Sequence, residues 1–246
     1  SRAFASKPAR KQAGPKALHM STAAKRDVQI SKSLSYLLRH GALKEKLPID
    51  SNGYVPVSTL LRHNRLKTHQ CTVQDIHRVV ASNDKKRFHL KTVDGQELVC
   101  ATQGHSIKAI NPAESVLSRI ESRSQLPDKL VHGTNVRNCK LILESGYVKK
   151  MNRNHVHLSP GVVGSDDAVV SGMRYSSSVH IHLQLDKVLG SLTLYKSLNN
   201  VYLTPDDVPV DLIDRIVIRP SKAKDPDAVR ALGELASGMG IDYTLE

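Results

Sequence analysis

Apolar positions near the start of the chain recur at helical spacing. Leu34, Leu37 and Leu38 stand at positions i, i+3 and i+4, which is the spacing of one buried face of a helix. Arg39 and His40 follow directly, and the next residue is a glycine, which commonly ends a helix. The pattern therefore predicts a short helix that ends on an arginine and a histidine.

Two further helices and a hairpin are predicted before residue 102. A turn signal at 50–53 precedes apolar positions at 57, 60 and 61, where helical spacing resumes. The segment 72–84 opens with Thr72 and Asp75 at the spacing of a capping box. Two alternating runs then flank an Asp-Gly pair at 94–95, which is a strong hairpin turn. Three helices followed by a hairpin is the element order of a winged helix, a common nucleic-acid-binding fold.

The rest of the chain is rich in strand patterns. A polar helix is predicted at 112–125, with a boundary at residue 127. Asn135 and Gly146 are the start and stop signals of another helix, and a last helix is predicted at 225–239. Runs of β-forming residues predict strands at 129–134, 154–159, 177–186, 191–197, 200–204 and 214–220. Together these patterns predict the α+β class.

Charge indicates the kind of partner. The 246 residues include 36 Lys or Arg and 23 Asp or Glu, a formal net charge of +13, which is typical of proteins that bind a polyanion such as nucleic acid. Residues 1–26 contain seven Lys or Arg and no acid, and they are predicted to form a disordered basic tail. No apolar run approaches the ~20 residues that span a bilayer, so we expect no membrane insertion. Three widely separated cysteines favour a reducing compartment.

Two basic segments have alternative interpretations. Arg39 and His40 suit the negative C-terminal end of a helix dipole, or they bind a ligand. Lys85, Lys86 and Arg87, before the first hairpin strand, are either a solvated charge run or contacts to nucleic-acid phosphates. The basic composition favours the phosphate interpretation.

Two histidine pairs raise the question of a metal. His155 and His157 are predicted to point to one face of a strand, as are His180 and His182. Imidazoles are common zinc ligands, but no sequence signal places these two strands side by side and no cysteine joins them. We therefore expect no metal, and we expect His180 and His182 to be ordinary half-buried strand residues.

Seven segments, in order, resemble one known family. They are LSYLLRHGA, IDSNGYVPVSTLL, NDKKRFHL, ATQGHS, LVHGT, RNHVHLS and NVYLT, spread from about residue 28 to residue 220. Together they resemble the NAD-dependent tRNA 2′-phosphotransferase family. The resemblance implies a winged-helix RNA-binding lobe at 27–126 and an ADP-ribosyltransferase-like NAD lobe at 127–220. The basic tail at 1–26 and a C-terminal extension at 221–246 lie outside it.

The resemblance also implies a reaction in two steps, with NAD⁺ as co-substrate. The internal 2′-phosphate left at the splice junction of ligated tRNA attacks the nicotinamide ribose and expels nicotinamide. The ribose 2″-hydroxyl then attacks the phosphorus, which gives RNA with a 2′-hydroxyl and ADP-ribose 1″,2″-cyclic phosphate.

Roles for particular residues follow from the same resemblance. The catalytic set is implied to be Arg39, His40, Arg87 and Arg153. The NAD⁺-binding set is implied to be His132, Gly133, Thr134, His157 and Ser159. Contacts to RNA or the site lining are implied for Lys85, Lys86, Gln103, His105 and Ser106. The chain departs from the family at Gly41, Cys100 and Asn199-Asn200, which puts turn geometry in doubt and removes no catalytic group.

Two alternative functions remain at this stage. One is an ADP-ribosyltransferase that modifies a nucleic-acid phosphate and stops after the first step. The other is a non-catalytic winged-helix binder whose β-rich part is a partner or zinc module. In each case we expect a monomer in the nucleus or cytoplasm, with organelle targeting by the basic tail left open.

Overall fold

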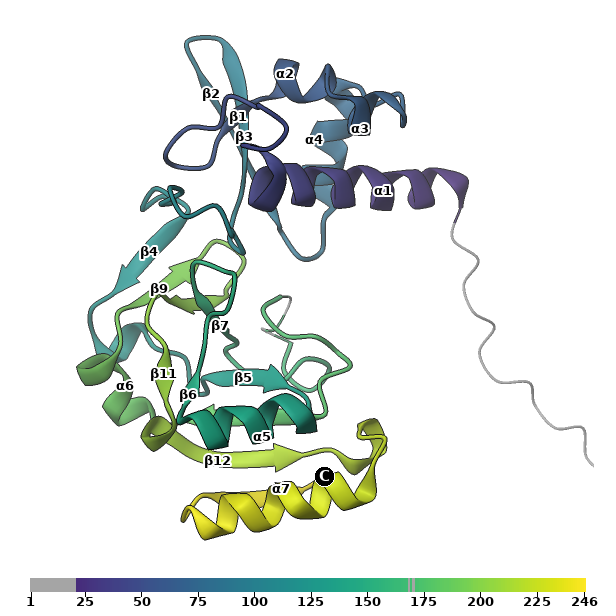
Figure 1. Ribbon diagram of the computed structural model, residues 1–246. Helices are drawn as coiled ribbons and strands as arrows, with labels where there is room; N and C mark the ends of the chain where they lie inside the picture. The colour runs from purple at the N-terminus through teal and green to yellow at the C-terminus, as the bar shows by residue number, and fades with distance from the viewer. Residues whose placement is uncertain (1–20, 168, 170) are drawn as a thin grey trace, which may run out of the picture.

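The computed structural model describes residues 21–167, 169 and 171–246, so the predicted basic tail lies outside the described residues up to residue 20. The described chain forms an N-terminal half, residues 21–110, and a C-terminal half that begins at residue 117, and each half has its own buried apolar cluster. Figure 1 shows the two halves one above the other. None of the described helices combines the length and the apolar composition needed to cross a membrane.

Helices dominate the N-terminal half. Helix α1 (Thr22–Tyr36) is capped by Ser21 and therefore starts before residue 26, where the tail was expected to end. It runs into a π-helical turn, η1 (Leu37–Gly41), so the predicted helix does finish on Arg39 and His40. Helices α2 (Val57–Leu61), α3 (Asn64–Lys67) and α4 (Val73–Ser82) follow. Thr72 and Asp75 form the predicted capping box of α4.

A three-stranded sheet completes this half. Strands β2 (Phe88–Val93) and β3 (Gln96–Ala101) are antiparallel, and the short strand β1 (Val55–Pro56) pairs with β3 to give the order β1-β3-β2. Asp94 and Gly95 both have positive φ angles, 49° and 76°, as a tight primed turn requires. The predicted hairpin is confirmed.

The C-terminal half contains two four-stranded sheets and a strand pair. The first sheet has the order β4-β9-β10-β7, with bounds Leu117–Ile120, Leu194–Ser197, Tyr202–Thr204 and Val156–Leu158. The second has the order β13-β12-β8-β5, with bounds Asp242–Leu245, Ile213–Ile218, Val179–Leu183 and Val131–Thr134. Strands β6 (Tyr147–Val148) and β11 (Val208–Pro209) form the pair. The helices are α5 (Val136–Ser145), α6 (Leu185–Ser191) and α7 (Pro226–Gly238), with short 3₁₀ turns at Arg123–Gln125, Val210–Leu212 and Pro220–Lys222.

The helix predicted at 112–125 is wrong. Strand β4 occupies its centre and pairs with β9, while Arg123–Gln125 forms a single 3₁₀ turn. Leu117 and Ile120 are the buried positions, and their separation of three residues is also helical spacing. Backbone pairing with β9 decides between the two structures, and a local pattern does not contain that information.

The chain beyond residue 220 is built into the second sheet. Helix α7, predicted from Pro226, buries Val229, Leu232 and Ala236, and β13 pairs in parallel with β12. A Cβ atom added to Gly233 would lie 2.6 Å from Cζ of Tyr243, so a glycine allows the helix to pack closely on β13. The last strand was not predicted.

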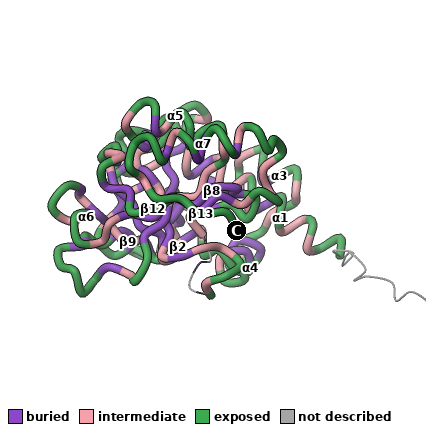
Figure 2. The backbone as a smooth tube through the Cα atoms, turned by 90° about the horizontal axis from the view of Figure 1, so that it is seen from below, coloured by how far each residue is buried: buried purple, intermediate pink, exposed green. Residues whose placement is uncertain are grey.

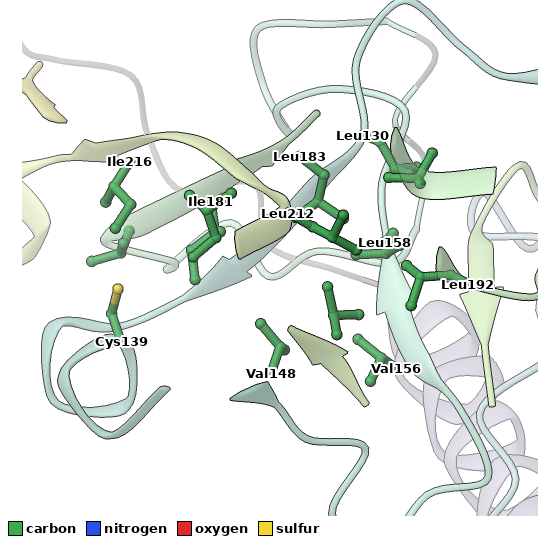
Figure 3. Close-up of a cluster of buried hydrophobic side chains, with 14 of the residues drawn as sticks. Leu130, Cys139, Val148, Val156, Leu158, Ile181, Leu183, Leu192, Leu212 and Ile216 are labelled. Atoms are coloured by element: carbon green, nitrogen blue, oxygen red, sulfur yellow. The ribbon is translucent and has the colours of Figure 1, made fainter. Parts of the chain in front are cut away.

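A core of branched aliphatic residues joins the layers of the C-terminal half. Figure 3 shows Ile181 of β8, Ile216 of β12, Leu158 of β7 and Cys139 of α5 within it. The backbone of β8 and β12 is largely buried between more exposed surface segments (Figure 2). His180 and His182 of β8 are 1% and 7% exposed, so they are more deeply buried than expected. The predicted α+β class agrees with these separate helices and sheets.

Candidate active site between the two halves

A cleft of about 590 Å³ lies between the two halves of the chain. The N-terminal half contributes Arg39 from η1, Lys85 and Arg87 from the segment before β2, and Gln103 from the segment after β3. The C-terminal half contributes the end of β5, residues 149–157 and the loop around 171–177. The volume lies in the range of sites that enclose a small-molecule ligand.

Arg39 lines this cleft and has two buried polar atoms. Its Nε and Nη2 atoms are buried and have no hydrogen-bond partner among the described residues. Burial and the nearby charges of Arg87 and Arg153 lower the pKa of its guanidinium to about 10, which leaves it cationic at neutral pH. Gly104 packs against it: with φ at +91°, its position for a Cβ lies 3.5 Å from Arg39 Cζ. Buried guanidinium nitrogens without a partner are expected to receive an anion.

His40 lies beside Arg39 at the end of the π-helical turn. Its Nδ1 is 2.8 Å from Oγ of Ser106, and the Ser106 amide donates to the Arg39 carbonyl, 2.9 Å away. Burial, then the charges of Arg153 and Arg39, lowers the pKa of His40 below its ordinary value. His40 is therefore held by the segment after β3, and the cations around it favour its neutral form.

Arg87 and Arg153 complete a group of four basic side chains. Nη1 of Arg87 lies 3.4 Å from Oδ1 of Asn83, and burial lowers the pKa of Arg87. Nη1 of Arg153 lies 3.3 Å from Nε2 of His157. The pKa of Arg153 is lowered by burial and by Arg174. The structure thus brings the four implied catalytic residues together from both halves.

His157 lies in the cleft and contacts residues of both halves of the chain. Its Nε2 is 2.9 Å from Oε1 of Gln103 and its Nδ1 is 3.2 Å from the His155 carbonyl. Burial, followed by the charge of Arg153, holds its pKa well below the ordinary value. A neutral ring carries one N–H, which donates either from Nε2 to Oε1 of Gln103 or from Nδ1 to the His155 carbonyl.

The His-Gly-Thr turn lies at the end of β5. Nδ1 of His132 donates to the His157 carbonyl at 3.0 Å, and burial lowers its pKa, so the neutral ring leaves Nε2 as an acceptor. At Gly133 an added Cβ would lie 2.4 Å from Cγ of Met173 and 3.0 Å from Oγ of Ser177. Only glycine lets the strand end approach that loop this closely. Thr134 also lines the cleft.

Of the remaining predicted site residues, one lines the cleft and the others lie outside its lining. Lys85 lines the cleft, whereas Lys86 is exposed outside its lining and has a φ of 43°. His105 is buried behind the cleft, where burial and Arg39 lower its pKa to about 3. Ser159 is fully buried, pairs with Val131 through its backbone, and its Oγ has no partner among the described residues.

Several residues that line the cleft were missed by the sequence reasoning. They are Asn135, Asn138, Lys149, Lys150, Met151, Asn152, Ser171, Gly172, Met173, Ser176 and Ser177, along with His155, which was considered only for zinc. Arg174, which lies in a segment similar to the family's, also lines the cleft. Lys149 and Lys150 form a basic pair just before Arg153, which was an available signal. The loop at 171–177 has no periodic pattern that could have indicated it.

The two histidine pairs do not meet. β7 and β8 belong to different sheets, and the backbone positions of His180 and His182 are paired with Val217 and Arg215 of β12. Within the described ranges no group of three or more His, Cys, Asp or Glu side chains is arranged to hold a metal ion.

The charge of the cleft defines the class of site. Among the described residues that line it, seven are Lys or Arg and none is Asp or Glu. Arginines bind phosphate through two parallel hydrogen bonds, and a lining without acids concentrates positive potential. The fold and the site together define an α+β protein with a strongly cationic cleft between two halves.

Comparison with known proteins narrows this class. The sequence pattern of the RNA 2′-phosphotransferase, Tpt1 / KptA family matches residues 25–206. A "tRNA 2′-phosphotransferase" of Saccharomyces cerevisiae is 54% identical over 220 residues, which cover 88% of this chain and 94% of that protein. A "tRNA 2′-phosphotransferase 1" of Danio rerio is 39% identical over 74% of this chain and 80% of its own length. The human protein of that name is 36% identical over 80% of this chain and 78% of its own length. The chain belongs to the RNA 2′-phosphotransferase, Tpt1 / KptA family, as the sequence resemblance predicted.

Proposed function

We propose that the chain is an NAD⁺-dependent tRNA 2′-phosphotransferase. An oxygen of the RNA 2′-phosphate attacks C1″ of the nicotinamide ribose, and the C1″–nitrogen bond breaks to release nicotinamide. The ribose 2″-hydroxyl then attacks the phosphorus, and the bond from phosphorus to the RNA 2′-oxygen breaks. The products are RNA with a 2′-hydroxyl and ADP-ribose 1″,2″-cyclic phosphate. The family membership of the chain supports this reaction.

The observation that supports the proposal most strongly is the grouping of three arginines at the cleft. Arg39, Arg87 and Arg153 come from both halves of the chain, burial and the charges of the last two lower the pKa of Arg39, and none of the described lining residues is acidic. A 2′-phosphomonoester beside a phosphodiester carries several negative charges, so cations fixed in advance stabilise its binding and the charge on its oxygens during transfer. The buried, unpartnered nitrogens of Arg39 are where such a phosphate would bind.

His40 is the group of this set that exchanges a proton near neutral pH. In the proposed second step the RNA 2′-oxygen leaves as an alkoxide and needs a proton. His40 supplies it and then recovers one from the 2″-hydroxyl or from water. Ser106, 2.8 Å from Nδ1, holds the ring and leaves Nε2 for the phosphate.

The residues at the end of β5 fit NAD⁺ as the second substrate. The neutral ring of His132 offers Nε2 as an acceptor for a ribose hydroxyl, and Gly133 lets the 171–177 loop pack closely beside it. Departure of nicotinamide leaves positive character on the ribose carbon. His157 is neutral, and the described lining contains no acid. The RNA phosphate is therefore the nucleophile that attacks this carbon and compensates its positive character.

The remaining expectations become parts of this proposal. Helices α1, α2 and α4 with the β2–β3 hairpin act as a winged-helix RNA lobe, and the two sheets of the C-terminal half act as an ADP-ribosyltransferase-like lobe. Lys85 and Lys86 contact phosphates that flank the reacting one. The protein acts as a monomer in the nucleus or cytoplasm.

A single reaction tests the proposal. Purified protein is mixed with NAD⁺ and a short RNA that carries one internal 2′-phosphate, and nicotinamide, RNA mass and ADP-ribose products are followed together. The proposal predicts loss of phosphate that depends on NAD⁺, with cyclic-phosphate ADP-ribose formed in equal amount. ADP-ribosylated RNA that persists would show an enzyme that stops after the first step. No change in any of the three would contradict the proposal.

A further inference from the structure

Asn154 connects the two halves of the chain directly behind the cleft. Its amide N–H donates to the His105 carbonyl at 2.9 Å. Its side-chain Nδ2 donates to the Ile107 carbonyl at 2.8 Å and to the Ile110 carbonyl at 3.3 Å. One residue of the C-terminal half thus satisfies three backbone acceptors of the segment 105–110.

Residues adjacent to Asn154 in the sequence link these hydrogen bonds to the candidate active site. Arg153 precedes it, and the Arg153 carbonyl accepts a hydrogen bond from Nζ of Lys108 at 3.2 Å. The segment 105–110, to which Asn154 is bonded, includes Ser106, and Oγ of Ser106 contacts His40. The position of Arg153 relative to His40 is therefore set through Asn154.

A second asparagine makes a contact of the same kind at the far side of the cleft. Asn199, 1% exposed, donates from Nδ2 to the Lys85 carbonyl at 3.0 Å. Its Oδ1 accepts from Oγ of Ser197 at 2.5 Å, which fixes the amide in this orientation. Lys85 precedes Arg87 by two residues, so this bond joins the C-terminal half to the segment that carries Arg87.

The hydrogen bonds of Asn154 and Asn199 oppose the electrostatic repulsion between the cationic side chains of the cleft. Arg39, Arg87 and Arg153 all line the cleft, and besides burial the charges of Arg87 and Arg153 lower the pKa of Arg39, so like charges lie close together there. No acid in the described lining offsets this repulsion. Without bonds between the halves, the cationic groups would move apart in the absence of substrate.

We propose that Asn154 and Asn199 are positioning residues that hold the two halves in register, so that Arg153 faces Arg39, His40 and Arg87 across the substrate phosphate. This inference rests on the proposed function and adds two residues to it. Asn154 contributes more to this positioning than Asn199, because it makes three contacts and adjoins Arg153.

The first test compares variants of Asn154. Asn154→Ala removes both side-chain bonds, and Asn154→Asp keeps the shape but turns a carboxylate oxygen toward the carbonyls. Asn111→Ala is the matched control, because Asn111 is exposed beside the same segment and its backbone, not its side chain, bonds Ser51. For each variant kcat, KM for NAD⁺, the amount of ADP-ribosylated RNA and the melting temperature are measured.

The two Asn154 variants are expected to lose roughly 10- to 100-fold in kcat, because displacing a group by about 1 Å has an effect of that size. KM for NAD⁺ is expected to stay within about twofold, since His132 and Gly133 belong to one half. ADP-ribosylated RNA is expected to accumulate, because Arg153 and His40 act together in the second step. Asn199→Ala is expected to show the same signature at smaller size, and Asn111→Ala none.

Two results would overturn the inference. One is a wild-type kcat in Asn154→Asp. The other is a lower melting temperature with unchanged kcat for the folded fraction and no accumulated intermediate, which would make Asn154 a purely structural residue. These results differ from failure of the proposed function, in which the wild-type protein itself would release no nicotinamide.

Discussion

At the residue scale, the pair Arg39-His40 shows how one sequence signal has two physical meanings. Cations at a helix end interact favourably with its dipole, and that alone explains their frequency there. The structure places them instead on a π-helical turn, with Nε and Nη2 of Arg39 buried and unpartnered among the described residues. Single π-helical turns are common at functional sites because they redirect side chains without ending the helix.

The proton-transfer role of His40 predicts a pH dependence. Burial and neighbouring arginines lower its pKa, so the fraction of protonated acid falls as the pH rises through a midpoint below the ordinary histidine value. The rate of RNA release under single-turnover conditions is expected to fall with rising pH in that window. A bound phosphate shifts the midpoint upward, because an anion stabilises the protonated ring.

The control variants make this assignment specific. His40→Gln is expected to abolish the pH dependence, and His77→Gln, whose ring contacts Glu97 away from the cleft, is expected to leave it unchanged. If His40→Gln retained the wild-type profile, another group would be the proton donor.

At the element scale, the sequence predicted the elements whose signals are local. The capping box of α4, the Asp94-Gly95 turn and the glycine stop of α5 are each set by a few neighbouring residues, and all three are present. Strand β4 was misread because its two buried residues have helical spacing, and β13 was missed because its strand identity depends on pairing with β12. Pairing between distant segments is not encoded in a local pattern.

Asp75 provides a test of how helices α1 and α4 are joined. Its side chain is 7% exposed, receives bonds from Arg26 and Arg78, and caps α4 by accepting from the Thr72 amide. Asp75→Ala is expected to lower the free energy of unfolding by about 2 kcal/mol, from a lost cap and a partly exposed ion-pair network. Urea denaturation would measure this, with the exposed Glu114→Ala as a control for net charge. A loss equal to that of the control would show that Asp75 does not join the helices.

At the scale of the whole molecule, the site depends on how the two halves meet. The resemblance named Arg39, Arg87 and Arg153, which the structure brings together at the cleft. Asn154 lies in one of the resembling segments and Asn199 at a departure from the family, but nothing in the sequence indicated that their side chains bond the other half. Hydrogen bonds to backbone carbonyls of a distant segment leave no mark on sequence spacing. Most of the lining loop at 171–177 was missed because it has no periodic pattern.

Buried histidines make the stability of the whole chain sensitive to acid. Burial lowers the pKa of His105 to about 3 and of His180 and His182 to about 4. The unfolded chain therefore binds protons that the folded chain excludes between these values and about 6.5, so stability falls as the pH falls through that window. The melting temperature is expected to drop from pH 7 to pH 5 by scanning calorimetry, and less so in His180→Gln. A melting temperature that did not change over that range would contradict neutral burial of these rings.

The central claim is that the cleft recognises a 2′-phosphate through cations from both halves. The direct measurement is the affinity of a short RNA with one internal 2′-phosphate, compared at one salt concentration with the same RNA carrying a 2′-hydroxyl. For the wild-type protein the phosphate is expected to tighten binding by about tenfold or more, since charge-assisted bonds to arginine are strong. In Arg39→Gln that ratio is expected to approach one, while the affinity for the 2′-hydroxyl RNA changes little. Equal affinities for the two RNAs, or a ratio that Arg39→Gln leaves intact, would contradict the account.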